Sequence, residues 1–295
     1  MDALKTTPRL AIDNILFATD FSSTSTGALA FGLAVARWYG SKILAVHAVM
    51  PEPHYSVPLE PIPLDLEPLY QQAKKKMAEC ETTRAFGDVP HEAIIQHGQP
   101  WEVVARVTRQ QRIDLLVLGT HGRTGIRKLV LGSQAEIIFR QATCPVVTVG
   151  PHVHTAPTES WNPKTVVFAT DFSEASLHAF PFALSLAEET QATLILAHFM
   201  ALVPVDRRDE AEADAYERLR KLIPLDAEQW FRPEFVVRVD FPAAGILNIA
   251  EEQKVDLVVM GVRKRTLPGA AAHLPWATAS EVVSRAPCPV LTVRG

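Results

Sequence analysis

The chain is poor in cysteine, in aromatic residues and in charge of a single sign. Its three cysteines provide neither a disulfide framework nor zinc-ligand spacing, which favours a reducing compartment. Lys and Arg number 29 against 33 for Asp and Glu, so no basic excess points to nucleic acid. No apolar run is long enough to span a membrane, and the first residues lack the apolar core of a signal peptide. We therefore expect a cytoplasmic protein that binds neither nucleic acid nor a membrane.

What the sequence does contain is an internal repeat. Four features of the first half return in the same order in the second half. They are Asn14–Ser22 and Thr165–Ser173, His47 and His198, Asp114–Gly119 and Asp256–Gly261, and Cys144–Val149 and Cys288–Val293. We predict two tandem domains at 1–150 and 164–295, each near the usual domain size. The segment 151–163, rich in Pro, His and Thr, is predicted to be a linker.

Short apolar runs alternate with helix-like segments in both copies. Runs without polar alternation, such as Leu115–Leu118, are typical of strands that are covered on both faces. The pattern predicts an α/β protein with two doubly wound, five-stranded parallel sheets. In the second copy it predicts helices at Ser176–Glu189 and Val282–Arg285. The proline-rich segment Pro51–Pro63 is predicted to be an extended loop, and the second copy has no counterpart to it.

A glycine-rich loop separates the Asp114–Leu118 strand from the helix predicted at Gln134–Ala142. Its glycines are Gly119, Gly122 and Gly132, and the last is followed by Ser133. Glycines let the backbone approach an anion closely, and a helix N-terminus offers unpaired N–H groups and a positive dipole end. The spacing is neither the Walker loop nor the dinucleotide fingerprint. The loop is therefore predicted to hold phosphates in a different manner.

This spacing resembles the ATP-binding motif of the universal stress protein family. The segment Phe17–Ser22 and Cys144-Pro-Val also match the family, and the resemblance covers nearly all of both copies. It implies a Rossmann-like fold related to the adenine nucleotide α-hydrolases, with ATP as ligand and Mg²⁺ held mainly by the phosphates and water. The positions that it assigns to the nucleotide site are Ala18, Asp20, Ala48, Leu118, Gly119, Gly122, Gly132, Ser133 and Gln134, and we add Arg123 and Arg127 because they lie inside the loop.

Several of these residues have a structural interpretation as well. Asp20 lies in a turn-forming segment, so it either caps that turn or binds the nucleotide. Ser133-Gln-Ala-Glu136 has the pattern of a capping box, which is compatible with phosphate binding at the remaining N–H groups. Arg123 and Arg127 either screen phosphate charge or are solvated, and solvation is favoured for His121.

Structural roles are also favoured for the repeated histidines and cysteines. His47 and His198 each follow the second strand of their copy, where a lone histidine is more often structural than catalytic. Cys144 and Cys288 each precede a proline at the start of a strand. A buried small residue is favoured there over a reactive thiol.

The second copy departs from the glycine motif. Gly261 remains, but Lys264 stands where the second glycine would be, and Trp276-Ala277 or Ala277-Thr278 falls opposite Gly132-Ser133. A capping box at Thr278-Ala-Ser-Glu281 still predicts a helix start. We therefore expect ATP in the first copy only.

The function that these features predict is a nucleotide-dependent stress-response regulator. The sequence contains no recognisable set of catalytic residues, so at most weak ATPase activity is expected. Two alternatives remain: an enzyme of the related α-hydrolase group, and a nucleotide-free interaction scaffold. Family members commonly dimerise through the final strand. The resemblance therefore implies pairing of Val146–Val149 with Val290–Val293 as an intramolecular pseudo-dimer, with self-association of the chain as a further possibility.

Overall fold

Strands and helices alternate through the whole structure, a computed structural model that describes residues 10–50, 65–83, 85–120, 132–153, 161–224, 232–263 and 273–295. The first half contains β1 (Asn14–Ala18), α1 (Ser23–Tyr39), β2 (Lys42–Val49), α2 (Glu67–Thr82), β3 (His91–His97), α3 (Pro100–Gln110), β4 (Leu115–Gly119), α4 (Ser133–Gln141) and β5 (Val146–Val149). The second half contains β6 (Thr165–Ala169), α5 (Glu174–His178), α6 (Phe180–Thr190), β7 (Thr193–Phe199), η1 (Val205–Arg207), α7 (Arg208–Arg220), β8 (Arg232–Arg238), α8 (Pro242–Glu252), β9 (Leu257–Val262), α9 (His273–Arg285) and β10 (Val290–Arg294).

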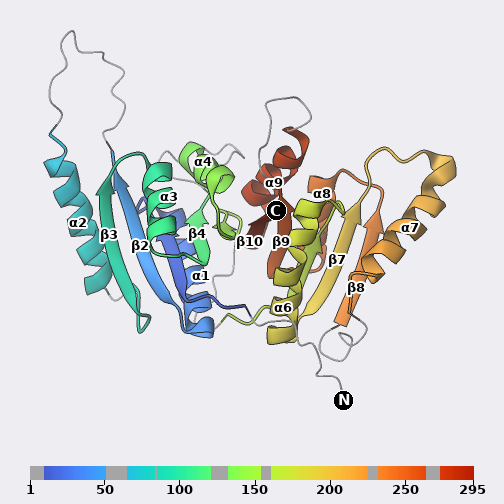
Figure 1. Ribbon diagram of the computed structural model, residues 1–295, viewed down its shortest axis with the longest axis horizontal. Helices are drawn as coiled ribbons and strands as arrows, with labels where there is room; N and C mark the ends of the chain where they lie inside the picture. The colour runs from blue at the N-terminus through green and yellow to red at the C-terminus, as the bar shows by residue number, and fades with distance from the viewer. Residues whose placement is uncertain are drawn as a thin grey trace, which may run out of the picture.

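One ten-stranded sheet passes through both halves, in the order β3-β2-β1-β4-β5-β10-β9-β6-β7-β8. Strands within each half are parallel, whereas β5 and β10 pair antiparallel, with Val147 opposite Leu291. Figure 1 shows α4 and α9 on either side of this central joint, with α2 and α7 at the two ends of the molecule. The predicted parallel α/β fold is confirmed, and the two final strands pair as the sequence predicts.

The two faces of the sheet are packed differently. Successive strand residues point to opposite faces, so Leu16 and Phe17 belong to different clusters. On one face a single apolar cluster crosses the central joint and includes Phe17, Val147 and Leu291. On the other face one cluster lies under α3 and α4 of the first half, and a second lies under α8 and α9 and also includes Phe139 of α4. The halves are therefore joined by apolar contacts on both faces as well as through the sheet.

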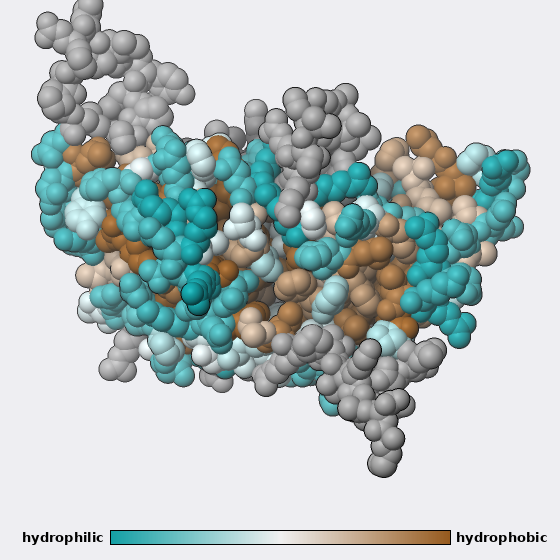
Figure 2. Space-filling view, viewed as in Figure 1, coloured by the Kyte–Doolittle hydropathy of each residue, from teal (hydrophilic) through white to brown (hydrophobic). Residues whose placement is uncertain are grey.

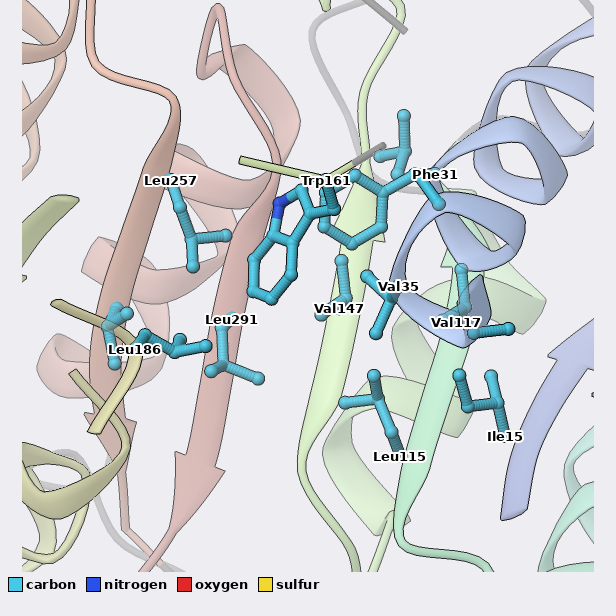
Figure 3. Packing of buried hydrophobic residues seen from close by; sticks show 14 of the residues in the cluster. Ile15, Phe31, Val35, Leu115, Val117, Val147, Trp161, Leu186, Leu257 and Leu291 are labelled. Atoms are coloured by element: carbon cyan, nitrogen blue, oxygen red, sulfur yellow. The ribbon is translucent and has the colours of Figure 1, made fainter. Parts of the chain in front are cut away.

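Trp161 fills the seam between the halves on the shared face. Its side chain is only 5% exposed, and its indole lies between Phe31 and Val147 of the first half and Leu257 and Leu291 of the second (Figure 3). The Phe31 ring meets it edge-on, with centroids 5.8 Å apart. The seam is thus apolar at its centre.

Polar contacts cross the edge of the same seam through Glu189 of α6. Tyr39 Oη donates to Glu189 Oε2 at 2.8 Å, and the Leu10 N–H donates to Glu189 Oε1 at 3.1 Å. A single carboxylate of the second half therefore holds two segments of the first half.

Two helices differ from the sequence prediction. The predicted helix Ser176–Glu189 is broken at Ala179 into α5 and α6. The break occurs because Pro181, in the first turn of α6, has no N–H to donate to a carbonyl of the preceding turn. Helix α9 begins at His273, nine residues before the predicted start at Val282. The predicted loop Pro51–Pro63 lies outside the described residues.

The visible surface is hydrophilic over the outer helices. In Figure 2 hydrophilic residues cover α2 and α3 at the left and the outer side of α7 at the right. Within the described ranges, no helix combines the length and the apolarity that crossing a membrane requires.

Candidate functional site

The strand order of the first half reverses between β1 and β4. These strands are parallel neighbours, with Ala18 opposite Leu118, and their connections leave to opposite sides. In open parallel sheets, ligands bind beyond the carboxyl ends of strands at such a point. Asp20 lies two residues after the end of β1, and Gly119 is the last residue of β4, so they lie at the same edge of the sheet.

Asp20 stabilises the turn that leads from β1 into α1. Its Oδ1 accepts the Ser22 N–H at 2.9 Å, and the Ser22 side chain caps α1 by accepting the Ser25 N–H. Phe21 between them has a left-handed backbone, with φ 62°. The turn-capping interpretation of Asp20 is confirmed. A carboxylate has two oxygens, so this role is compatible with nucleotide binding, which stays a prediction.

Packing against α1 favours glycine at position 119. A Cβ there would lie 3.0 Å from the carbonyl carbon and oxygen of Thr24 in the first turn of α1. The equivalent Gly261 is tighter still, 2.0 Å from the Ala175 oxygen. Leu118 is 2% exposed and lies within the core, so only its main chain borders the crevice. Both glycines are thus explained by the close approach of a helix to a strand end.

The start of α4 offers the features that an anion needs. Gly132 is the N-cap residue, and α4 has no side-chain hydrogen bond at its cap. The Gly132 N–H donates to the Thr120 carbonyl at 2.8 Å, which ties the helix start to the end of β4. Thr120, fully buried, is a residue that the sequence analysis missed, because nothing in its type or spacing signals this contact.

Ser133 is the first residue of α4 and not its cap, so the predicted capping box is wrong. Glu136, its predicted partner, pairs instead with Arg140 at 2.6 Å. The predicted box at Thr278 is also wrong, because Thr278 lies inside α9. The N-cap residue of α4 consequently offers no side-chain acceptor to the first-turn N–H groups.

Gln134 carries an unsatisfied polar atom at the same place. Its Oε1 is buried and has no hydrogen-bond partner. Buried polar atoms are normally paired, and an amide can turn over to present its N–H₂ group instead. A phosphate oxygen could accept from that group. The residues present therefore fit a phosphate-bearing ligand.

Two alanines stand at the ends of neighbouring strands beside this crevice. Ala18 ends β1 and Ala48 is the penultimate residue of β2, and both are half-buried against the core. Their small side chains leave room at the strand ends.

Some of the predicted site residues lie outside the described residues. They are Gly122, Arg123 and Arg127, with His121 beside them, and in the second half Lys264 and the side chain of Trp276.

Among the residues that the structure describes, no three His, Cys, Asp or Glu side chains are grouped to hold a metal ion. The three cysteines are free, and burial raises the pKa of Cys144 and of Cys288 to about 12. Both thiols stay protonated, which confirms the structural interpretation of these two residues.

The equivalent strand ends of the second half are linked by an ion pair. Arg263 Nη2 lies 3.3 Å from Asp171 Oδ2, bridging the ends of the neighbouring strands β6 and β9. Burial raises the pKa of Asp171, but hydrogen bonds from Ser173 and Ser176 and the charge of Arg263 outweigh it and hold that pKa below its usual value. The carboxylate that repeats Asp20 is therefore engaged by the protein itself.

Comparison with known proteins identifies the class. The profile of the universal stress protein family matches residues 11–150 and 162–294, so the chain belongs to that family, with one family unit in each half. The family predicted from the glycine spacing and the repeat is thereby confirmed.

Individual relatives match single units or the whole chain. The universal stress protein in the QAH/OAS sulfhydrylase 3'region of Thermus aquaticus is 33% identical over 141 residues, covering 46% of this chain and 96% of that protein. Universal stress protein MJ0531 of Methanocaldococcus jannaschii is 29% identical over 139 residues, covering 46% and 80%. The crystal structure of a universal stress protein from Archaeoglobus fulgidus DSM 4304 matches 96% of both chains with a TM-score of 0.70 and 20% identity, which shows the shared fold.

Proposed function

We propose that this universal stress protein binds ATP in the crevice between β1 and β4, in a domain spanning 1–150. The observation that supports this most is the start of α4, which has no side-chain cap and is tied to β4 at the point where strand order reverses. Helix N-termini in such positions bind phosphates through main-chain N–H groups and the helix dipole. The motif glycines Gly119, Gly122 and Gly132 have the spacing of the family's ATP loop.

The residues divide by the part of the nucleotide that each suits. Ser133, Gln134 and the loop glycines suit the phosphates, with Arg123 and Arg127 as candidates to screen their charge. Asp20 suits ribose hydroxyls, since a carboxylate accepts two donors. Mg²⁺ would be held mainly by phosphate oxygens and water, with no dedicated protein cage.

The second domain, 164–295, is proposed not to bind ATP. The Arg263–Asp171 pair occupies the place where ribose would meet a carboxylate. Binding there would have to break an ion pair that is already made, which lowers affinity. Residues 151–163 would form the linker, and the second domain would act as the packing partner of the first. The protein would be cytoplasmic, and nucleotide binding would change its conformation or its choice of partner. We propose no enzymatic role beyond slow hydrolysis.

The direct test is a calorimetric titration of nucleotide-free protein with ATP. We expect a Gly122→Ala, Gly132→Val double variant to lose at least about tenfold in affinity, because added side chains crowd the phosphates. An Arg285→Ala variant, on the exposed side of α9, serves as control and should bind like the unaltered protein. Absence of binding, or equal affinity of the double variant, would overturn the proposal.

A nucleotide-free scaffold is the second candidate, because apolar side chains are exposed near the strand ends of the second half. Leu202 and Val205 after β7 are 90% and 92% exposed, and Phe241 after β8 is 68% exposed. Native mass spectrometry of freshly purified protein separates the two candidates. An added mass of ATP supports the first, and an unrelated mass or none favours the scaffold.

A further inference from the structure

In each half a cation, a phenyl ring and an imidazole lie next to the turn that carries the repeated aspartate, Asp20 or Asp171. In the first half the rings of Phe21 and His47 have centroids 4.5 Å apart, and Lys76 Nζ lies 5.7 Å from the Phe21 centroid. In the second half the Phe172 and His198 rings are also 4.5 Å apart, and Arg218 lies over Phe172 at 3.9 Å. The arrangement recurs although the second half has lost the glycine motif. The arrangement is therefore a feature of the repeated strand–turn–helix segment and does not depend on the glycine motif.

His47 fixes the main chain just before Asp20. Its Nδ1 lies 2.8 Å from the Thr19 carbonyl oxygen. A carbonyl only accepts, so Nδ1 carries the hydrogen and the tautomer is set. The Thr19 N–H donates to the Val46 carbonyl at 3.0 Å. Both main-chain groups of Thr19 are therefore held by β2.

The residue just after Asp20 is held in an unfavourable conformation. Phe21 has φ 62°, a left-handed backbone that residues with large side chains rarely adopt. The Thr19 Oγ1 accepts the Phe21 N–H at 2.9 Å, and the His47 ring packs against the Phe21 side chain. Asp20 thus lies between two residues that His47 contacts directly. If His47 lost these contacts, the turn could relax and the carboxylate would move.

We propose that His47 is a positioning residue for nucleotide binding, acting through the Thr19 carbonyl and the Phe21 ring to aim the Asp20 carboxylate at the ligand. The inference rests on the proposed ATP site. The Asp171 turn of the second half, which His198 contacts in the same way, is already paired with Arg263. The second half therefore supplies a matched control within the same chain.

The test compares His47→Phe with His198→Phe in the full chain. Phenylalanine keeps an aromatic ring but has no donor for the threonine carbonyl. We expect both variants to lose similar thermal stability. His47→Phe should weaken ATP binding by about tenfold, the equivalent of one lost hydrogen bond, whereas His198→Phe should leave it within about twofold.

Two further variants separate positioning from a general structural role. His47→Asn, whose amide can place an N–H₂ near the former Nδ1, should recover part of the affinity. In an Asp20→Asn background, His47→Phe should add less than about twofold, because residues that act through one another are not additive.

Equal affinity of His47→Phe and the unaltered protein would overturn the positioning role while leaving the ATP site intact. Equal losses in both histidine variants, or a fully additive loss with Asp20→Asn, would also overturn it. No ATP binding by the unaltered protein would overturn the site and the positioning role together.

Discussion

At the scale of single residues, the repeated aspartates have the same local role in the two halves. Asp20 and Asp171 each accept the N–H two residues on, at 2.9 Å in both halves. Asp171 also faces Arg263, on the neighbouring strand end. The turn was predictable from sequence because its contacts are local. The ion pair was not, because Arg263 and Asp171 meet only through the pairing of β6 with β9.

The pH dependence of stability tests this pair. The pKa of Asp171 is lowered in the folded protein, so its contribution is present above the unfolded value of about 3.9 and is lost as pH falls through the folded value. We expect Asp171→Asn to be less stable than the unaltered protein at pH 7, with the difference shrinking below about pH 4. Urea unfolding at several pH values measures this. A difference that does not change with pH would contradict the assignment.

At the scale of elements, helix α1 connects the candidate site to the seam. It begins at the Ser22 cap beside the crevice and carries Phe31 and Val35 into the shared core. It ends at Tyr39, and the C-cap residue Gly40 has a left-handed φ of 72°, which glycine adopts readily. Strands were predicted well because buried apolar runs are specific. The start of α9 and the capping boxes of α4 and α9 were not, because a capping-box pattern is short and tertiary contacts decide where a helix begins.

Removing the cap of α1 provides the test at this scale. Ser22→Ala should cost about 1 kcal/mol of unfolding free energy, because the Ser25 N–H loses its acceptor. Ser173→Ala, the same change at the start of α5, should cost about as much. Only Ser22→Ala should also weaken ATP binding. Denaturant unfolding and calorimetry measure the two effects, and a weakened affinity in both variants would contradict the asymmetry.

At the scale of the molecule, the halves are expected to unfold together. The apolar cluster on one face crosses the central joint, and Trp161 lies within it (Figure 3). The sequence predicted the pairing of β5 with β10 through the family resemblance. It did not predict the role of Trp161, because that residue lies at the end of the presumed linker and its partners come from distant parts of both halves.

Trp161→Ala should therefore destabilise the whole chain. We expect a loss of about 3–5 kcal/mol, as is usual when a buried aromatic side chain is removed from a core. Trp161→Phe, which fills part of the space, should lose less. Urea unfolding followed by circular dichroism measures both variants. Two separate transitions in the unaltered protein, or no loss in Trp161→Ala, would show that the halves are energetically independent.

The most direct test of the central claim, that only the first half binds ATP, is the stoichiometry of binding. Calorimetric titration of nucleotide-free protein should give one ATP per chain. Gly132→Val should weaken that binding by at least about tenfold. Arg263→Ala should leave both stoichiometry and affinity unchanged, because the second half lacks the glycine motif even when the ion pair is removed. Two ATP per chain, or binding that survives Gly132→Val and is lost in Arg263→Ala, would contradict the account.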